Sequence, residues 1–230
     1  MSVQRIRVWF RKGERLRYIS HLDVLRFWER AIRRAGLPLA YSQGFTPHPK
    51  LAFASPLPLG FVGESEIMDV TLDERMDLDS FRSRLAAETS EDLGLVAVAE
   101  VPLGTPAPQA CLAWADYSVD VSGVSLAEAG VVICDFLALT EMAWTGDRRE
   151  RNRTIDLRAA VSQLSAEAAG AGVRLRLRAR AHQDLTVRPE DVLAALFPGV
   201  EATAIRRIAV VLDEPSPARD AWRRRGRFEE

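Results

Sequence analysis

The feature that most constrains the fold is a change of hydrophobic period near the start of the chain. In residues 5–11, apolar side chains alternate with Arg5, Arg7 and Arg11, which predicts a half-buried strand with a basic outer face. In residues 20–35, apolar side chains recur at three- and four-residue spacing, which predicts an amphipathic helix with a buried stripe of Leu22, Leu25, Trp28, Ile32 and Ala35. A helix that is apolar on one side needs a surface to cover, and the preceding strand indicates a sheet. We therefore predict an α+β fold.

The same two periods predict the order of the elements that follow. Strands are expected at 51–60, 65–72 and 94–103 and a helix at 78–88, so the first half reads βαββαβ. This is the ferredoxin-like order. After a Pro/Gly-rich linker at 103–110, a similar but decorated series is expected. Its strands are predicted at 115–123, 141–146, 154–157, 173–181 and 202–212. Its helices are predicted at 125–139 and 188–197, with one or two helical turns after residue 157 that end at about Ala169.

The domain prediction is two tandem ferredoxin-like (βαββαβ) halves with antiparallel sheets. The halves cover residues 1–104 and 111–214, and residues 215–230 form an arginine-rich tail. Ser20 is expected to cap the first helix, with Asp23 at the capping-box position.

Charge is distributed unevenly although the net charge is only −1. Residues 1–50 contain eleven Lys and Arg and three acidic residues, whereas residues 51–104 contain three Arg and eleven acidic residues. The first segment is a candidate anion-binding surface. In the alternative interpretation, the two segments pack together and neutralise each other.

The cysteines and the lack of long apolar runs restrict the classes of function. Cys111 and Cys134 are the two cysteines of the sequence, and their apolar surroundings favour buried thiols in a reducing compartment. No signal peptide or membrane span is expected, so we predict a cytoplasmic protein that does not bind membranes. We also predict no cofactor in this chain and no metal. His21, Asp23 and His48 are conceivable ligands, but their spacing does not support a site.

The segment YSQGFTPHPK, residues 41–50, has the composition of a rigid loop rather than of a helix or strand. Gly44 indicates a positive φ or a close approach, and Pro47 and Pro49 reduce loop entropy. We interpret the loop as presenting side chains to a ligand or partner. The alternative is purely structural, with Phe45 plugging the loop against the sheet.

Residues 18–60, YISHLDVLRFWERAIRRAGLPLAYSQGFTPHPKLAFASPLPLG, resemble the signature of the radical SAM-linked (radical SAM-associated) protein family. RTIDLR and DLTVRPEDVLAALFPG resemble its later blocks, and Thr46 stands where an asparagine is usual. This family is a domain of unknown function found beside, or fused to, radical SAM enzymes. The resemblance therefore implies a radical SAM partner that carries the chemistry, because an iron–sulfur cluster of that kind needs clustered cysteines.

Two histidines suggest a catalytic alternative. His21, at the start of the first helix, and His48, in the loop, are possible acid and base of a metal-independent endoribonuclease. In the simpler interpretation, His21 lies beside the Ser20 cap and His48 makes a hydrogen bond to the backbone.

Aromatic and basic residues together suggest single-stranded RNA, since rings stack on bases and cations hold phosphates. VRLRLRAR, residues 173–180, places arginines on one strand face, either as a ladder for phosphates or as a solvated surface. GDRRERNR, residues 146–153, is expected to be an exposed turn. The residues predicted to bind RNA or a partner are Lys12, Tyr18, His21, Arg26, Arg30, Arg33, Arg34, Tyr41, Gln43, Gly44, Phe45, His48, Lys50, Arg174, Arg176 and Arg178.

The sequence favours a non-catalytic accessory component of a radical SAM enzyme that binds or presents an RNA substrate. The alternatives are the endoribonuclease and a protein–protein adaptor without RNA binding.

Overall fold

The computed structural model describes residues 2–146, 154–170 and 172–213. It is an α+β fold in two compact units. Residues 113–211 form unit 2, and the described residues outside that range form unit 1. The arginine-rich run at 147–153 and the tail at 215–230 lie outside the described residues. Among the helices of the described residues, none is long and apolar enough to cross a membrane.

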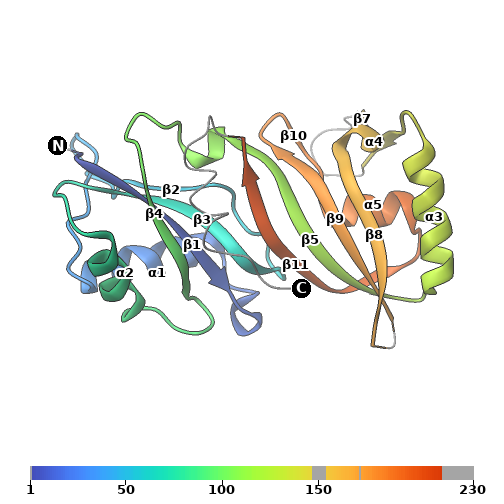
Figure 1. Cartoon of the computed structure of the whole chain (residues 1–230), viewed down its shortest axis with the longest axis horizontal. Coiled ribbons are helices and arrows are strands. Elements are labelled where there is room, and N and C mark those ends of the chain that lie inside the picture. The colour runs from blue at the N-terminus through green and yellow to red at the C-terminus, as the bar shows by residue number, and fades with distance from the viewer. Residues whose placement is uncertain (1, 147–153, 171, 214–230) are drawn as a thin grey trace. The chain divides into compact units, whose positions relative to one another are not determined.

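Unit 1 contains an antiparallel sheet with the strand order β4–β1–β3–β2. Its helices α1 and α2 lie in the βαβ connections before β2 and before β4, as the order of the elements in Figure 1 shows. The elements are β1 (Gln4–Lys12), η1 (Glu14–Leu16), α1 (His21–Arg34), β2 (Leu51–Phe53), β3 (Val62–Leu72), α2 (Leu78–Ala86), β4 (Leu95–Val101) and η2 (Pro108–Ala110).

The core of unit 1 lies between the sheet and its two helices. Val8 on β1, Trp28 and Ile32 on α1, and Phe81 on α2 are completely buried in one hydrophobic cluster. The predicted helical stripe is correct for Trp28 and Ile32. It is wrong for Leu22, whose side chain is exposed because Val24 and Ala31 complete the buried face instead.

The first strand was predicted to have a basic outer face, but only some of its arginines are exposed. Arg7 is buried, and its Nε and Nη2 donate to the two carboxylate oxygens of Asp69 at 2.8 and 3.1 Å. Arg5 donates to the same carboxylate and to the backbone oxygen of Pro106 at 2.8 Å. The segment after β4 therefore covers this part of the strand, whereas Arg11 remains exposed.

Unit 2 is built on strands that lie in the order β8–β9–β5–β11, with the short β10 also paired to β9 (Figure 1). A separate hairpin, β6–β7, precedes α4. The elements are β5 (Leu112–Ser122), α3 (Leu126–Ala138), β6 (Ala143–Thr145), β7 (Thr154–Asp156), α4 (Leu157–Ala160), β8 (Val161–Ala169), β9 (Gly172–His182), β10 (Leu185–Thr186), α5 (Pro189–Leu196) and β11 (Glu201–Leu212).

One or two helical turns were predicted to end at about Ala169, but the helix there, α4, ends at Ala160. Residues 161–169 form β8, which pairs antiparallel with β9. The alanines of this segment, with Gln163 and Glu167, favour a helix locally, but pairing with β9 buries Val161 and Leu164. The tertiary contact therefore overrides the local preference.

Candidate nucleic-acid interface

The loop at residues 41–50 is a closed hairpin. Tyr41 and Pro49 form an isolated antiparallel bridge. The Ser42 N–H donates to the His48 carbonyl at 2.8 Å, and the His48 N–H donates to the Ser42 hydroxyl at 2.9 Å. The backbone of His48 therefore fixes the base of the loop, as does the N–H of Lys50, which donates to the Ala40 carbonyl at 2.8 Å. The His48 side chain itself is exposed.

The tip of this hairpin presents an aromatic ring to solvent. Gly44 has a φ of +140°, a region that favours glycine. Phe45, the next residue, has a relative exposure of 109%, so the idea that it plugs the loop against the sheet is wrong. Gln43 is also exposed, and Tyr41 is 37% exposed.

Helix α1 leads into this loop and carries three exposed arginines, Arg26, Arg30 and Arg33, on one side. Arg26 lies 3.8 Å from the Asp23 carboxylate, and both groups are largely exposed. The fourth predicted arginine is engaged elsewhere, because Arg34 Nε donates to Glu88 at 2.6 Å.

The beginning of α1 is fixed as predicted. Ser20 and Asp23 form a capping box, in which the Asp23 N–H donates to the Ser20 hydroxyl at 3.2 Å. The hydroxyl of Ser20 in turn donates to Asp23 and lowers the pKa of that carboxyl below its ordinary value.

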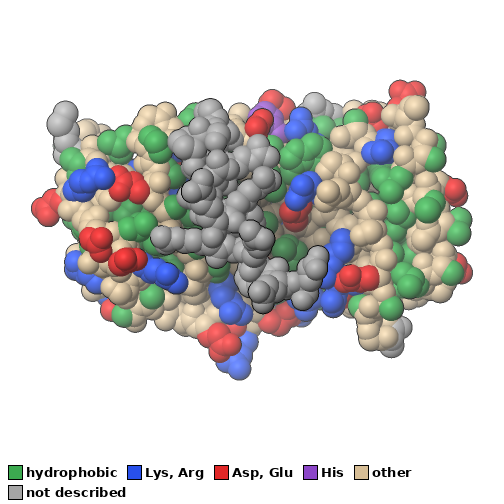
Figure 2. Space-filling model, in the orientation of Figure 1, with side chains coloured by type: hydrophobic (Ala, Val, Ile, Leu, Met, Phe, Trp, Pro, Cys, Tyr) green, Lys and Arg blue, Asp and Glu red, His purple; other side chains and the backbone are tan. Residues whose placement is uncertain are grey.

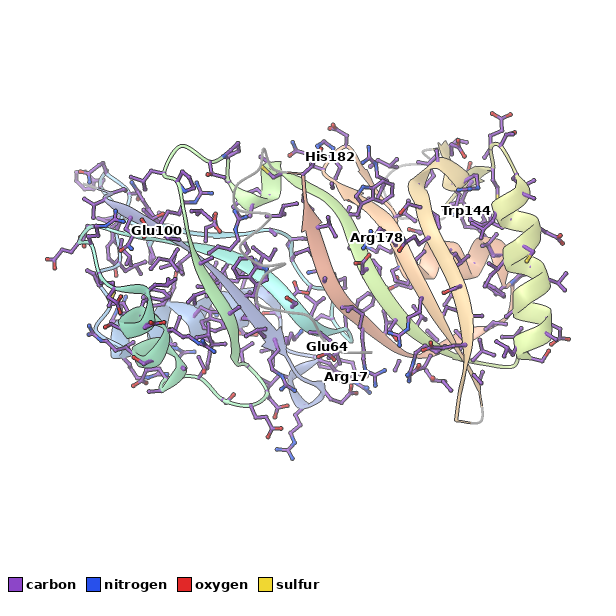
Figure 3. All side chains as sticks on the ribbon, in the orientation of Figure 1. Arg17, Glu64, Glu100, Trp144, Arg178 and His182 are labelled. Atoms are coloured by element: carbon purple, nitrogen blue, oxygen red, sulfur yellow. The ribbon has the colours of Figure 1, made fainter. Side chains whose placement is uncertain are left out.

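Lys12 is a predicted binding residue that lies inside the protein. It is 2% exposed, and its Nζ donates to the carbonyls of Arg17 and Ile19 at 3.0 and 3.1 Å. An ammonium held in this way is not part of an exposed basic face. Tyr18, in contrast, is 70% exposed, and the Arg17 guanidinium (Figure 3) lies 4.8 Å from its ring centroid.

The two histidines of the nuclease alternative have different surroundings. His21 is half-buried, its ring lies edge-on to Phe53 with the centroids 5.1 Å apart, and it lines a small pocket with Lys12 and Glu66. His48 belongs to the exposed loop. In the described part of the chain, no group of three His, Cys, Asp or Glu residues is arranged to hold a metal ion.

The arginines of β9 lie on one face of the unit 2 sheet, as predicted, but they are paired with carboxylates. Arg174 donates to Asp120 at 2.5 and 3.2 Å, and Arg178 donates to Asp116 at 2.5 and 2.7 Å. Figure 2 shows basic and acidic side chains beside one another over these strands. The face is therefore a mixed-charge surface rather than a row of unpaired arginines.

Two further groups extend this surface. Arg176 donates to Glu167 on β8 at 3.1 and 2.8 Å, and Arg206 on β11 donates to Asp120 at 2.9 Å. The Arg174 hydrogen bond lowers the pKa of Asp120. The Asp116 hydrogen bond raises the pKa of Arg178, which Figure 3 places on β9.

Sequence reasoning missed Asp116 and Asp120, although a signal was present. These residues are four apart on a strand, as are Arg174 and Arg178, and the register pairs the first with Arg178 and the second with Arg174. Complementary spacing on two strands was a detectable sign of cross-strand ion pairs.

A family model described as "Uncharacterized protein conserved in bacteria (DUF2344)" matches residues 5–189. The chain belongs to this family. No curated protein matches it. The DUF2344 match includes α1, the loop at 41–50 and the paired face of β5 and β9, and it ends at the first residue of α5.

Solved structures similar to this DUF2344 chain share little sequence with it. A Cbf5–Nop10–Gar1 complex matches with 14% identity, 90% of this chain, 48% of that chain and a TM-score of 0.47. An H/ACA RNP bound to a substrate RNA containing 2′-deoxyuridine matches with 14% identity over 90% of this chain and 47% of that chain, with a TM-score of 0.46. An unknown protein from Galdieria sulphuraria matches with 13% identity over 90% of this chain and 99% of that chain, with a TM-score of 0.26. The chain spans about half the length of the first two.

Proposed function

We propose that this protein binds single-stranded RNA through the loop at 41–50 and the exposed arginines of α1. The observation that carries the proposal is the complete exposure of Phe45 at the tip of a hairpin whose base is closed by hydrogen bonds. An apolar ring in water is unfavourable, and stacking on a base removes part of its surface from water. Because the hairpin base is already ordered, little conformational entropy is lost on binding.

The arginines of α1 supply the complementary contact to phosphate. Arg26, Arg30 and Arg33 are exposed, whereas Arg34 is held by Glu88. Guanidinium groups bind phosphate oxygens with charge-assisted hydrogen bonds. Only six residues separate the end of α1 from Tyr41, so the same short segment of chain carries the cations and the aromatic tip.

The chemistry on such an RNA belongs, in this proposal, to a radical SAM enzyme that uses this protein as an accessory component. The support is the resemblance of residues 18–60 to the radical SAM-linked family, together with a sequence that has two cysteines. Those two thiols are too few to hold the cluster that such an enzyme requires.

The fold assignment that accompanies this proposal is ferredoxin-like for both units. In unit 1 the elements β1, α1, β2, β3, α2 and β4 give the strand order β2–β3–β1–β4. In unit 2, with the hairpin β6–β7, α4 and β10 as insertions, the remaining elements give β8–β9–β5–β11. The two orders are equivalent, which supports tandem units of one topology.

The RNA proposal is tested by fluorescence anisotropy with a short labelled single-stranded RNA at several salt concentrations. Phe45→Ala should weaken binding about 10-fold, as expected for one lost stacking contact. Replacing Arg26, Arg30 and Arg33 by Gln should weaken binding further and reduce the slope of log affinity against log salt by about 0.7 per lost phosphate contact. Leu59→Ala and Arg75→Gln, also at exposed positions of unit 1, are the controls and should leave binding unchanged.

If neither the Phe45 variant nor the arginine variant changes RNA affinity, the proposal is wrong. The accessory role is tested separately by co-purification from the native host. The expected partner contains an iron–sulfur cluster and three clustered cysteines. If the loop contacts this partner, less of it should co-purify with the Phe45→Ala variant than with the wild type. Loss of that partner with unchanged RNA affinity would instead favour the adaptor function.

A further inference from the structure

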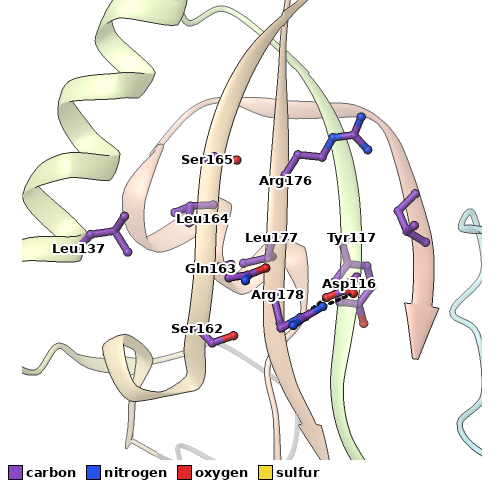
Figure 4. Close-up of a pocket in the computed structure, with 11 residues that line it drawn as sticks. Asp116, Tyr117, Leu137, Ser162, Gln163, Leu164, Ser165, Arg176, Leu177 and Arg178 are labelled. Atoms are coloured by element: carbon purple, nitrogen blue, oxygen red, sulfur yellow. Dashed lines mark hydrogen bonds and ion pairs between the residues drawn. The ribbon is translucent and has the colours of Figure 1, made fainter. Parts of the chain in front are cut away.

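Unit 2 contains a pocket of about 400 Å³ that lies over strands β8 and β9 (Figure 4). This volume is within the range of small-ligand sites. Its polar lining consists of Asp116, Ser162, Gln163, Ser165, Arg176 and Arg178. Leu164, Leu177 and Tyr117 also border it, but their side chains are buried and alternate along the strands with the polar ones, so they point to the opposite face of the sheet.

A β-bulge supplies some of the polar lining. The register between β8 and β9 shifts between Val161, which is opposite Ala179, and Gln163, which is opposite Arg178. Ser162 is the extra residue, and both Ser162 and Gln163 are exposed. Bulges redirect side chains and are frequent beside functional sites. Here the bulge brings a hydroxyl and an amide to the same pocket.

Arg178 has a guanidinium plane that is fixed by its partner. Its Nε and Nη2 donate to the two oxygens of Asp116 at 2.5 and 2.7 Å, as the dashed lines in Figure 4 show. The side chain is still 35% exposed, so one part of the group remains open to a ligand. A planar guanidinium held in one orientation is a suitable platform for a nucleobase.

Arg176 has a weaker attachment than Arg178. Its ion pair with Glu167 has both side chains 47% exposed. Exposed pairs of this kind contribute about 0–1 kcal/mol, so an anionic ligand can replace the carboxylate at little cost. Arg176 is therefore the group in the pocket that is best suited to bind a phosphate.

We infer that this pocket binds a nucleotide, with the base on Arg178 and hydrogen-bonded to Gln163, and the phosphate on Arg176. The ligand is either a free nucleoside monophosphate or one nucleotide of an RNA strand, because both offer the same base and phosphate. The inference uses only residues of unit 2, so it does not depend on RNA binding by the loop at 41–50.

The experiment is calorimetric titration of the full chain with each nucleoside 5′-monophosphate and with the corresponding nucleoside. At least one monophosphate should bind, and more tightly than its nucleoside. Arg176→Gln should weaken the monophosphate about 10-fold or more, since it removes a charge-assisted contact. Gln163→Ala should weaken binding and reduce the preference among bases.

Arg174→Gln is the matched control, because Arg174 lies on the same face of β9 and is ion-paired, but does not line the pocket. It should leave nucleotide affinity unchanged. If a short RNA competes with the monophosphate, the ligand is one nucleotide of an RNA strand. If the RNA does not compete, the ligand is the free nucleotide. Lack of binding by every monophosphate at millimolar concentration, or equal losses in the Arg174 and Arg176 variants, overturns the inference. Unchanged unfolding midpoints of the variants show that they remain folded.

Discussion

At the residue scale, Asp69 illustrates how far a local pattern can mislead about exposure. Alternation along the first strand predicts that its arginines face solvent, yet Arg7 is buried. Asp69 is 1% exposed and accepts hydrogen bonds from both Arg5 and Arg7. The register places Arg7 directly opposite Asp69, a relationship between residues 62 apart in the sequence. Such a pair is apparent only once the strands are aligned.

We expect Asp69→Ala to lower the free energy of unfolding by about 3–5 kcal/mol, because it leaves two guanidiniums, one of them buried, without this carboxylate. The measurement is equilibrium urea unfolding. Glu167→Ala, which breaks the exposed pair with Arg176, is the control and should change stability by about 0–1 kcal/mol. Similar effects of the two substitutions would contradict the distinction between a buried and an exposed ion pair.

At the element scale, the polar face of the unit 2 sheet depends on the pairing of whole strands. Trp114 on β5 is opposite Arg180, whose guanidinium lies 4.7 Å from the indole centroid. Farther along β5, Asp116 is opposite Arg178 and Asp120 is opposite Arg174. This face holds its charges by cross-strand pairing, which explains how several arginines can lie on alternate residues of one strand despite their mutual repulsion.

The pH dependence of unit 2 follows from Asp120, whose pKa is lowered by Arg174 and then by Arg206. A carboxyl with a lowered pKa in the folded state stabilises the protein above its unfolded pKa of about 3.9 and loses that contribution as the pH falls through the folded value. We therefore expect Asp120→Asn to destabilise the protein at neutral pH and to flatten the acid-side decline of stability below about pH 4. Urea unfolding across acidic pH measures both effects. An acid-side slope equal to that of the wild type would contradict this assignment.

At the scale of the whole molecule, the uneven charge along the sequence is partly neutralised within unit 1. The acidic segment at 51–104 supplies partners for the basic segment at 1–50: Asp69 for Arg5 and Arg7, Glu88 for Arg34, and Asp92 for Arg15. The interpretation that the two segments neutralise each other is therefore correct for these residues. The exposed arginines of α1 remain, and they are the ones assigned to phosphate in the proposed function.

The cysteines permit a prediction for the whole chain. Cys111 is buried as expected, but the expectation is wrong for Cys134, which is exposed on α3. We expect anaerobic reconstitution with iron and sulfide to leave the purified protein without a cluster, because the sequence has only these two thiols. Iron and labile sulfide are measured after desalting, with a radical SAM enzyme treated in parallel as the positive control. Stoichiometric iron and sulfide in this protein would contradict the accessory role proposed for it.

The sequence by itself was sufficient for features that depend on near neighbours. The capping box at Ser20 was predictable because its partners are three residues apart, and most helices and strands were predictable from hydrophobic period. The positive φ of Gly44 was also predictable, since few other residues adopt it easily.

Only the tertiary structure decided which charged side chains are available to a ligand. The burial of Lys12 and the pairing of Arg174 and Arg178 each depend on segments brought together by the fold. The same is true of β8, whose local composition favours a helix until β9 supplies hydrogen-bond partners. The physical reason is that burial and ion pairing are set by residues distant in sequence, whereas period and capping are set within a few turns of the chain.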